Sequence, residues 1–148
     1  MADIRHRVGI AAPLEEVYGA VATVDGVRSW WTREAYGADG VGERVALHFG
    51  RPEPSAIYEV TDLDGAGRVG WRFIDGPPEW IGTTVDFDLR AEGDETVVLF
   101  THSDWREPVE FMHHCSSKWG VFLMGLKRGL EGGTAAPFPD DARISDWG

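Results

Sequence analysis

Residues 109–133, VEFMHHCSSKWGVFLMGLKRGLEGG, decide the fold of this chain. Apolar side chains recur through the stretch with the 3.6-residue period of a helix, and Gly132-Gly133 ends the pattern. The predicted helix is long and carries one broad apolar stripe, so it needs a large apolar surface to cover. The stripe consists of Val109, Met112, Cys115, Trp119, Phe122, Leu123, Leu126 and Leu130.

The segment before this helix has the two-residue period of β-strands, which supplies such a surface. Turn residues such as Asp64–Gly67 and Asp75–Pro78 separate the strands by short connections, so we predict an antiparallel meander. The five predicted strands are ERVALHFG (43–50), AIYEVTDL (56–63), GRVGWRFI (67–74), GTTVDFDLRA (82–91) and ETVVLFTHS (95–103).

The N-terminal part adds one strand and two short helices. IRHRVGI (4–10) alternates as a strand, and PLEEVYGAVAT (13–23) reads as a helix that Pro13 opens and Asp25-Gly26 breaks. VRSWWT (27–32) is long enough for a second short helix.

The element order predicts an α+β fold. We expect a curved antiparallel sheet of about six strands wrapped on the long C-terminal helix, with two short helices after strand one. A closed barrel with an appended helix is the alternative. Residues 1–148 are predicted to form a single domain, with residues 133–148 as an irregular tail packed on it.

Composition limits the classes of partner. The formal net charge of −11 argues against nucleic acid and against anionic membrane surfaces, because both require basic protein surfaces. No apolar run is long enough for a membrane span, and the first ten residues lack the apolar core of a signal peptide, so a cytoplasmic location is expected. Cys115 is the single cysteine, which excludes an intramolecular disulfide.

Three stretches resemble a known superfamily: APLEEVYGAVATVDGVRSWW (12–31), TVVLFTHSDW (96–105) and LKRGLEGGTAAPFPDD (126–141). Together with the element order they are similar to the START-like (SRPBCC, helix-grip) superfamily, and most similar to small bacterial members of the activator-of-heat-shock-protein-ninety-ATPase group. The resemblance implies a cavity between the long helix and the sheet. Many members bind lipids, hormones or aromatic polyketides there, and a minority catalyse cyclisation or dehydration.

The turn EGDE (92–95) predicts which residues face this cavity. A turn centred on Gly93-Asp94 places Leu89 opposite Val98, Phe87 opposite Phe100, and Val85 opposite His102. These residues form an apolar face that ends at His102. His102 either orients a ligand or acts as an acid or base, or it is a buried histidine bonded to the backbone.

Adjacent Trp30 and Trp31 cannot share one face of a helix or strand. We expect Trp30 to anchor the second short helix in the core and Trp31 to face the pocket mouth, the tail or a partner, although the reverse assignment is equally compatible with the sequence. The candidate ligand-binding residues are Trp31, Phe49, Tyr58, Trp71, Phe73, Phe87, Phe100, His102, Trp119 and Phe122.

The polar motifs elsewhere in the sequence do not indicate a metal site or a pair of catalytic carboxylates. The HHC motif at 113–115 has zinc-ligand types but not the i, i+4 spacing of a helical site, so neither a metal nor a cofactor is predicted. Asp86 and Asp88 share the strand face opposite the apolar one, which favours a solvent-facing role.

Three functions are compatible with these observations. The first is binding of a small hydrophobic or aromatic molecule, with no catalytic residue assigned. The second is a polyketide cyclase or dehydratase that uses His102 and Tyr58. The third is an interaction module for a chaperone. A homodimer is also left open by the sequence.

Overall fold

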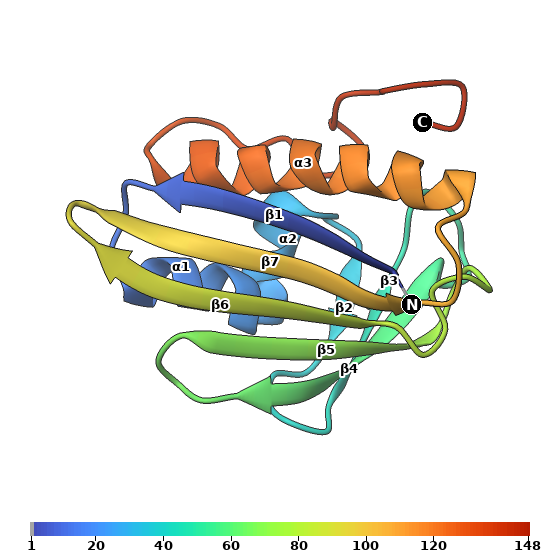
Figure 1. Ribbon diagram of the computed structural model, residues 1–148, viewed down its shortest axis with the longest axis horizontal. Helices are drawn as coiled ribbons and strands as arrows, with labels where there is room; N and C mark the ends of the chain where they lie inside the picture. The colour runs from blue at the N-terminus through green and yellow to red at the C-terminus, as the bar shows by residue number, and fades with distance from the viewer. Residues whose placement is uncertain (1) are drawn as a thin grey trace.

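The computed structural model describes residues 2–148, which form one seven-stranded antiparallel sheet and three helices (Figure 1). The strand order is β1-β7-β6-β5-β4-β3-β2. Because β1 and β2 are the two edges and do not pair, the sheet is open, and the closed-barrel alternative is wrong. The elements are β1 (Ala2–Ile10), α1 (Leu14–Ala22), α2 (Val24–Trp30), β2 (Ala35–Gly37), β3 (Arg44–Leu47), β4 (Ala56–Leu63), β5 (Arg68–Asp75), β6 (Thr84–Glu92), β7 (Glu95–Trp105) and α3 (Glu110–Leu130).

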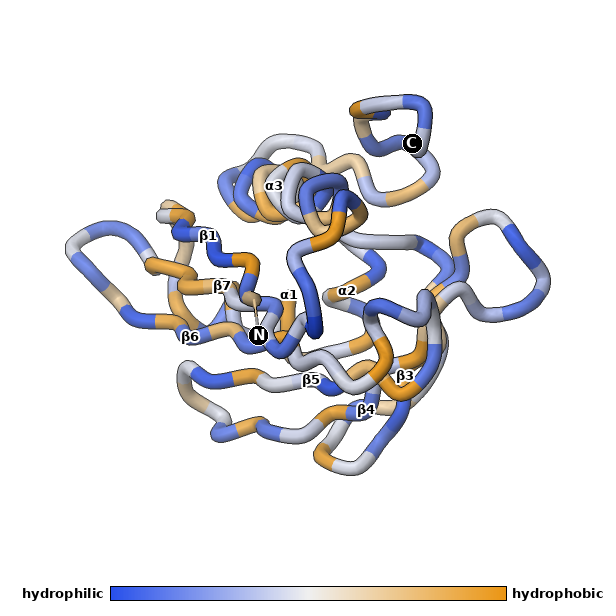
Figure 2. Tube along the Cα trace, turned by 45° about the vertical axis from the view of Figure 1, so that its right-hand side comes forward, coloured by the Kyte–Doolittle hydropathy of each residue, from blue (hydrophilic) through white to orange (hydrophobic). Residues whose placement is uncertain are grey.

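The predicted helix-grip architecture is confirmed. The long helix α3 lies across the sheet beside β1, and α1 and α2 pack beneath it against the same face (Figure 1). Hydrophobic and hydrophilic residues alternate along the strands (Figure 2). The hydrophobic set on the covered face forms the core with the stripe of α3, where Cys115, Trp119, Phe122, Leu123 and Leu126 are buried. None of the helices within residues 2–148 is both long and apolar enough to cross a membrane.

The β6–β7 hairpin has the predicted register. Leu89 pairs with Val98, Phe87 with Phe100 and Val85 with His102. Gly93 has a φ of 61°, the conformation that the first central position of a type II′ turn requires and that glycine adopts without strain. The two-residue turn therefore sets which side chains of both strands face the core.

The break between the two short helices differs from the prediction. It lies at Thr23, whose Oγ1 accepts a hydrogen bond from the Gly26 amide (3.0 Å) and donates to the Gly19 carbonyl (2.7 Å). Asp25 and Gly26 are inside α2. A side chain at Gly26 would lie 2.4 Å from the Gly19 carbonyl oxygen, so this glycine allows α1 and α2 to cross closely rather than ending a helix.

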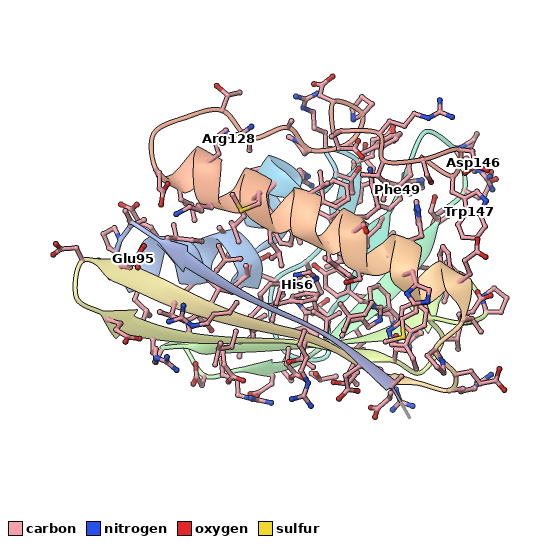
Figure 3. The ribbon with its side chains drawn as sticks, turned by 45° about the horizontal axis from the view of Figure 1, so that its top comes forward. His6, Phe49, Glu95, Arg128, Asp146 and Trp147 are labelled. Atoms are coloured by element: carbon pink, nitrogen blue, oxygen red, sulfur yellow. The ribbon has the colours of Figure 1, made fainter. Side chains whose placement is uncertain are left out.

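The C-terminal segment packs against the outer side of α3 and the loop after α2. The Phe138 amide donates to the Trp31 carbonyl (2.8 Å), and the Phe138 ring packs edge-on against Phe49. The chain then returns to the first half of α3, where Asp146 and Trp147 lie beside the helix (Figure 3). The Trp147 ring contacts His114 there.

Candidate functional site

Stacked aromatic rings fill much of the space between the sheet and α3. Tyr58 of β4 stacks on Trp71 of β5 with ring centroids 4.2 Å apart, and Trp71 stacks on Trp31 at 5.8 Å with an interplanar angle of 4°. Trp31 also meets Trp119 of α3, with ring centroids 4.7 Å apart and planes tilted by 46°. This column links the sheet, the end of α2 and α3 through side chains that are almost fully buried.

The two adjacent tryptophans have different roles. Trp30 ends α2, and its indole Nε1 donates to the Ala20 carbonyl at 2.8 Å, which ties α2 to α1. Trp31 follows the helix as its C-terminal cap, so the backbone turns there and directs the second ring into the column. Both rings are buried, at 1% and 2% exposure. The backbone of Trp31 meets the C-terminal segment, because its carbonyl accepts a hydrogen bond from the Phe138 amide at 2.8 Å.

His102 is fully buried, and both of its ring nitrogens are engaged. The Trp119 indole donates to His102 Nδ1 at 3.2 Å, and because an indole nitrogen is only a donor, the imidazole proton must be on Nε2. Nε2 donates to Thr83 Oγ1 at 2.8 Å, and that hydroxyl donates to the Trp80 carbonyl at 2.6 Å. Burial lowers the pKa of His102 to about 3, so the ring is neutral at physiological pH. His102 thus orients Trp119 and the turn before β6.

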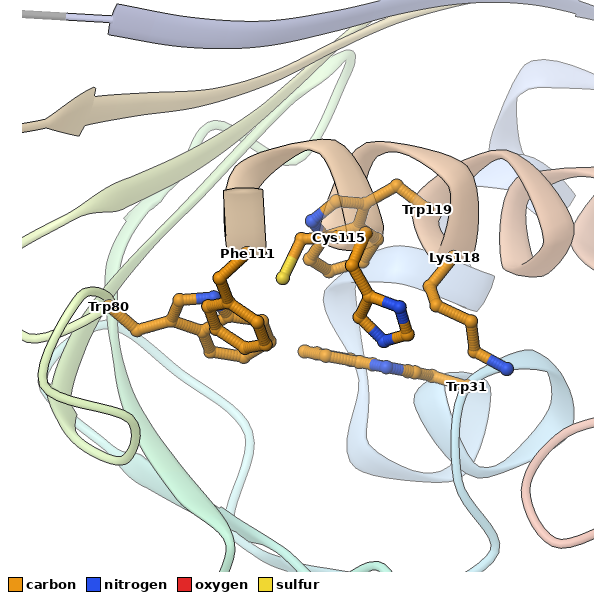
Figure 4. Close-up of a pocket in the computed structure, with 7 residues that line it drawn as sticks. Trp31, Trp80, Phe111, Cys115, Lys118 and Trp119 are labelled. Atoms are coloured by element: carbon orange, nitrogen blue, oxygen red, sulfur yellow. The ribbon is translucent and has the colours of Figure 1, made fainter. Parts of the chain in front are cut away.

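A small cavity of about 130 Å³ remains open at the end of this aromatic core (Figure 4). It lies between the first half of α3, the residue after α2 and the turn that leads into β6. Most of its wall is aromatic, and we call it the aromatic cavity. Its lining residues are Trp31, Trp80, Phe111, His114, Cys115, Lys118 and Trp119.

The polar groups on this wall are mostly neutralised. Lys118 forms an ion pair with Asp141 and donates to the Ala142 carbonyl at 2.9 Å. Burial raises the pKa of the Cys115 thiol to about 12, which outweighs the neighbouring Trp80 indole. Burial and the Lys118 charge both lower the pKa of His114. At neutral pH the cavity therefore presents a thiol, a neutral imidazole and a paired ammonium group.

The structure distributes the ten predicted ligand-binding residues over three zones. Trp31 and Trp119 line the aromatic cavity. Five residues lie one ring away, each in contact with one of these two tryptophans: Phe49, Trp71, Phe73, Phe100 and His102. The remaining three belong to the surrounding core: Tyr58, Phe87 and Phe122.

Sequence reasoning missed Trp80 and Phe111 as cavity residues. Trp80 lies in the turn GPPEWIG. A large aromatic residue in a Pro- and Gly-rich turn is the signal that would have identified it. Phe111 is one position before Met112 of the apolar stripe, so it borders the predicted helix face. The sequence places Cys115 on the apolar stripe of the long helix and His114 only within the HHC motif.

The other polar candidates lie away from the aromatic cavity. Asp86 and Asp88 project from the outer face of β6, where Arg68 bonds to them at 3.1 and 2.8 Å. Within the HHC motif, His113 is exposed, His114 is half-buried and Cys115 is buried, so the three side chains diverge. Within residues 2–148, no three side chains of His, Cys, Asp or Glu are placed together to hold a metal ion.

Comparison with known proteins identifies the family. The family described as Activator of Hsp90 ATPase homolog 1-like protein matches residues 11–131. The chain belongs to this family. The resemblance seen in the sequence, a START-like member of the activator group, is thereby confirmed.

Solved structures agree with the assignment. The solution structure of the Aha1 dimer from Colwellia psychrerythraea is 40% identical to this family member, covers 90% of this chain and 98% of its own, and has a TM-score of 0.81. CalU16 from Micromonospora echinospora is 23% identical and covers 97% of this chain and 74% of its own, with a TM-score of 0.78. SSP2350 from Staphylococcus saprophyticus is 17% identical and covers 92% and 97%, with a TM-score of 0.75. The latter two show a shared fold. No curated protein matches this family member significantly.

Proposed function

We propose that this protein binds one small apolar ring compound in the aromatic cavity. The observation that carries the proposal is an open space of about 130 Å³ whose wall is built largely from Trp31, Trp80, Phe111 and Trp119. Engineered cavities of about 150 Å³ bind benzene, whereas pockets for drug-sized ligands span roughly 300–1,000 Å³. The size therefore favours a ligand with a single ring over a lipid, a hormone or a polycyclic polyketide.

The walls of the aromatic cavity are preorganised. Trp31 is held by stacking on Trp71, and Trp119 is held by its hydrogen bond to His102. A ligand that enters a preformed apolar site orders few protein groups, so less of its binding energy is lost on association. This supports binding without a large rearrangement of the chain.

The geometry favours binding over the cyclase or dehydratase alternative. That alternative relies on His102 and Tyr58 as proton-transfer groups, and neither lines the aromatic cavity. His102 is neutral with both nitrogens engaged, and burial raises the pKa of Tyr58 far above its usual value. Proton transfer to a ligand in this cavity would require groups other than these two.

Toluene is the probe that tests the proposal, with Cys115→Met and Cys115→Ala as a pair of variants. The longer methionine side chain fills an irregular gap easily and occupies the space that the probe needs. We expect wild-type protein and Cys115→Ala to bind one toluene molecule, and Cys115→Met to bind it at least about tenfold more weakly. Heteronuclear NMR titration measures all three. Equal affinity for wild type and Cys115→Met would place the probe elsewhere and overturn the proposal.

We also infer that the chain forms a homodimer. The supporting observation is the dimer of the 40% identical relative, which this chain matches over 98% of that relative's length. Sedimentation equilibrium should therefore give twice the 16.4 kDa mass of one chain. A single 16.4 kDa species over the whole concentration range would contradict the inference.

A further inference from the structure

The aromatic cavity adjoins a second hollow that is more open to solvent. Phe111 and His114 line both spaces, so they form a shared border. The outer hollow has a volume of about 310 Å³, and Glu79 and Trp147 complete its wall. We call this outer hollow the vestibule. A ligand whose ring fills the aromatic cavity therefore has room to extend an arm toward solvent.

Glu79 gives the vestibule an unpaired negative charge. This side chain is exposed, and within residues 2–148 no basic side chain forms an ion pair with it. Burial is the main cause of the raised pKa of the Cys115 thiol, and the Glu79 charge adds to it, so this charge acts as far as the cavity wall. Arg106 and Glu107 share a separate hollow with Glu79 and carry opposite charges. The carboxylate can therefore attract a cationic group in the vestibule.

Trp147 presents an aromatic ring to the same space. Its side chain is 51% exposed, which is unusual for so large an apolar group. A tight turn holds it, because the Trp147 amide donates to Ser145 Oγ and the Gly148 amide donates to the Ser145 carbonyl, both at 3.1 Å. The ring also meets His114 with centroids 5.6 Å apart. Indole faces attract ammonium groups, so Trp147 favours the same kind of ligand as Glu79 does.

We propose that the ligand of the aromatic cavity is an arylalkylamine, whose ring lies in the cavity and whose ammonium group lies in the vestibule between the Glu79 carboxylate and the Trp147 ring. This inference rests on the proposed function and names the ligand class for the same site. The apolar ring is the part that the cavity encloses, and the charged arm stays near solvent, where its hydration is largely kept.

The basic groups nearby do not oppose an ammonium arm. Lys118 is paired with Asp141, and Figure 4 shows it at the end of the cavity opposite Phe111. Burial and the Lys118 charge lower the pKa of His114, and the Asp146 charge opposes them only in part, so this imidazole is neutral at pH 7.5. Arg143 does not line the vestibule, and its Nε donates to a backbone carbonyl.

Other kinds of arm fit the vestibule less well. A carboxylate would meet the unpaired charge of Glu79 and the nearby Asp146, and the chain carries a net charge of −11. A neutral arm gains nothing from the carboxylate. An ammonium ion is attracted by both the local and the overall charge, which also raises the rate of its encounter with the protein.

The test compares 2-phenylethylammonium with 2-phenylethanol at pH 7.5. The two probes have nearly the same size and shape and differ in charge. An exposed ion pair and a cation–π contact together favour the ammonium probe by about 3- to 30-fold. Heteronuclear NMR titration measures both affinities. The Trp147 indole cross-peak, assigned with Trp147→Leu, should move more with the ammonium probe than with the alcohol.

Matched variants separate local attraction from overall charge. Glu79→Gln and Trp147→Leu should each weaken binding of 2-phenylethylammonium by about 2- to 5-fold and leave that of 2-phenylethanol unchanged. Glu95→Gln removes the same charge at the opposite end of the molecule from Trp147 (Figure 3), and it should bind both probes as the wild type does.

Each alternative outcome has a definite meaning. If toluene binds but the wild type does not prefer the ammonium probe, the ligand carries no ammonium arm, while the apolar cavity stands. If Glu95→Gln weakens binding of that probe as much as Glu79→Gln does, the preference reflects overall charge, and the vestibule is not its site. If toluene and both probes fail to bind, the proposed function itself fails.

Discussion

His102→Leu should lower the free energy of unfolding at pH 7.5 by about 2–4 kcal/mol. The substitution leaves the buried Trp119 indole without its acceptor, which costs about 1–3 kcal/mol. Replacing an imidazole by a side chain of similar volume adds up to about 1.5 kcal/mol. Thr83 still donates to the Trp80 carbonyl, so its hydroxyl remains bonded. Urea denaturation at pH 7.5 measures the difference.

The same substitution should make the protein less sensitive to acid. Burial lowers the pKa of His102 to about 3 in the folded state, against an unfolded value of about 6.5. The unfolded chain therefore binds a proton that the folded chain refuses, and stability falls as the pH drops from 6.5 toward 3. By pH 4.5 this group alone removes about 2–3 kcal/mol from the wild type and nothing from His102→Leu.

The difference between the two proteins isolates His102. Other groups with shifted pKa values, including Asp64, Glu131 and His114, titrate equally in both proteins and cancel. The gap in unfolding free energy should thus shrink by about 2–3 kcal/mol between pH 7.5 and pH 4.5. His113→Leu, at an exposed position, serves as the control and should follow the wild type. A gap that stays constant would show that folded His102 takes up protons readily, and would restore it as a candidate acid or base.

Local patterns were sufficient to predict six of the seven strands. The alternation of AIYEVTDL predicts β4 with the bounds 56–63 that the structure shows, and the two-residue turn at Gly93-Asp94 sets the register of β6 and β7. Both features depend on neighbouring residues alone. β2 was missed because three residues, Ala35–Gly37, are too few to display a period.

The aromatic cavity was predictable only in part, because it depends on packing between distant segments. Trp119 follows from the stripe of α3, and Trp31 follows from the paired tryptophans. How much of the interior the rings fill depends on their stacking, such as that of Tyr58 on Trp71, which no local pattern determines. The sequence therefore predicted an aromatic interior, while the structure reduces its open part to about 130 Å³.

Trp31→Ala should cost about 3–5 kcal/mol of unfolding free energy, the range for removing a large buried aromatic side chain. The Trp31 ring is 2% exposed and contacts both Trp71 and Trp119, so its loss leaves a void that these two packed rings cannot close. Trp147→Ala is the matched control. That indole is 51% exposed and contacts only the edge of the site through Phe111 and His114, so its removal should cost less than about 1 kcal/mol.

A second variant keeps this prediction testable if Trp31→Ala does not fold. Trp31→Phe retains an aromatic ring in the column and widens the aromatic cavity by the volume of the missing pyrrole portion. We expect it to fold with a smaller loss, and to bind naphthalene, which the wild type should exclude because its cavity of about 130 Å³ suits a single ring. NMR titrations with toluene and naphthalene measure this change in size selectivity. If the wild type binds naphthalene as tightly as Trp31→Phe does, then Trp31 does not set the boundary of the cavity, and the ligand must enter by displacing a different wall.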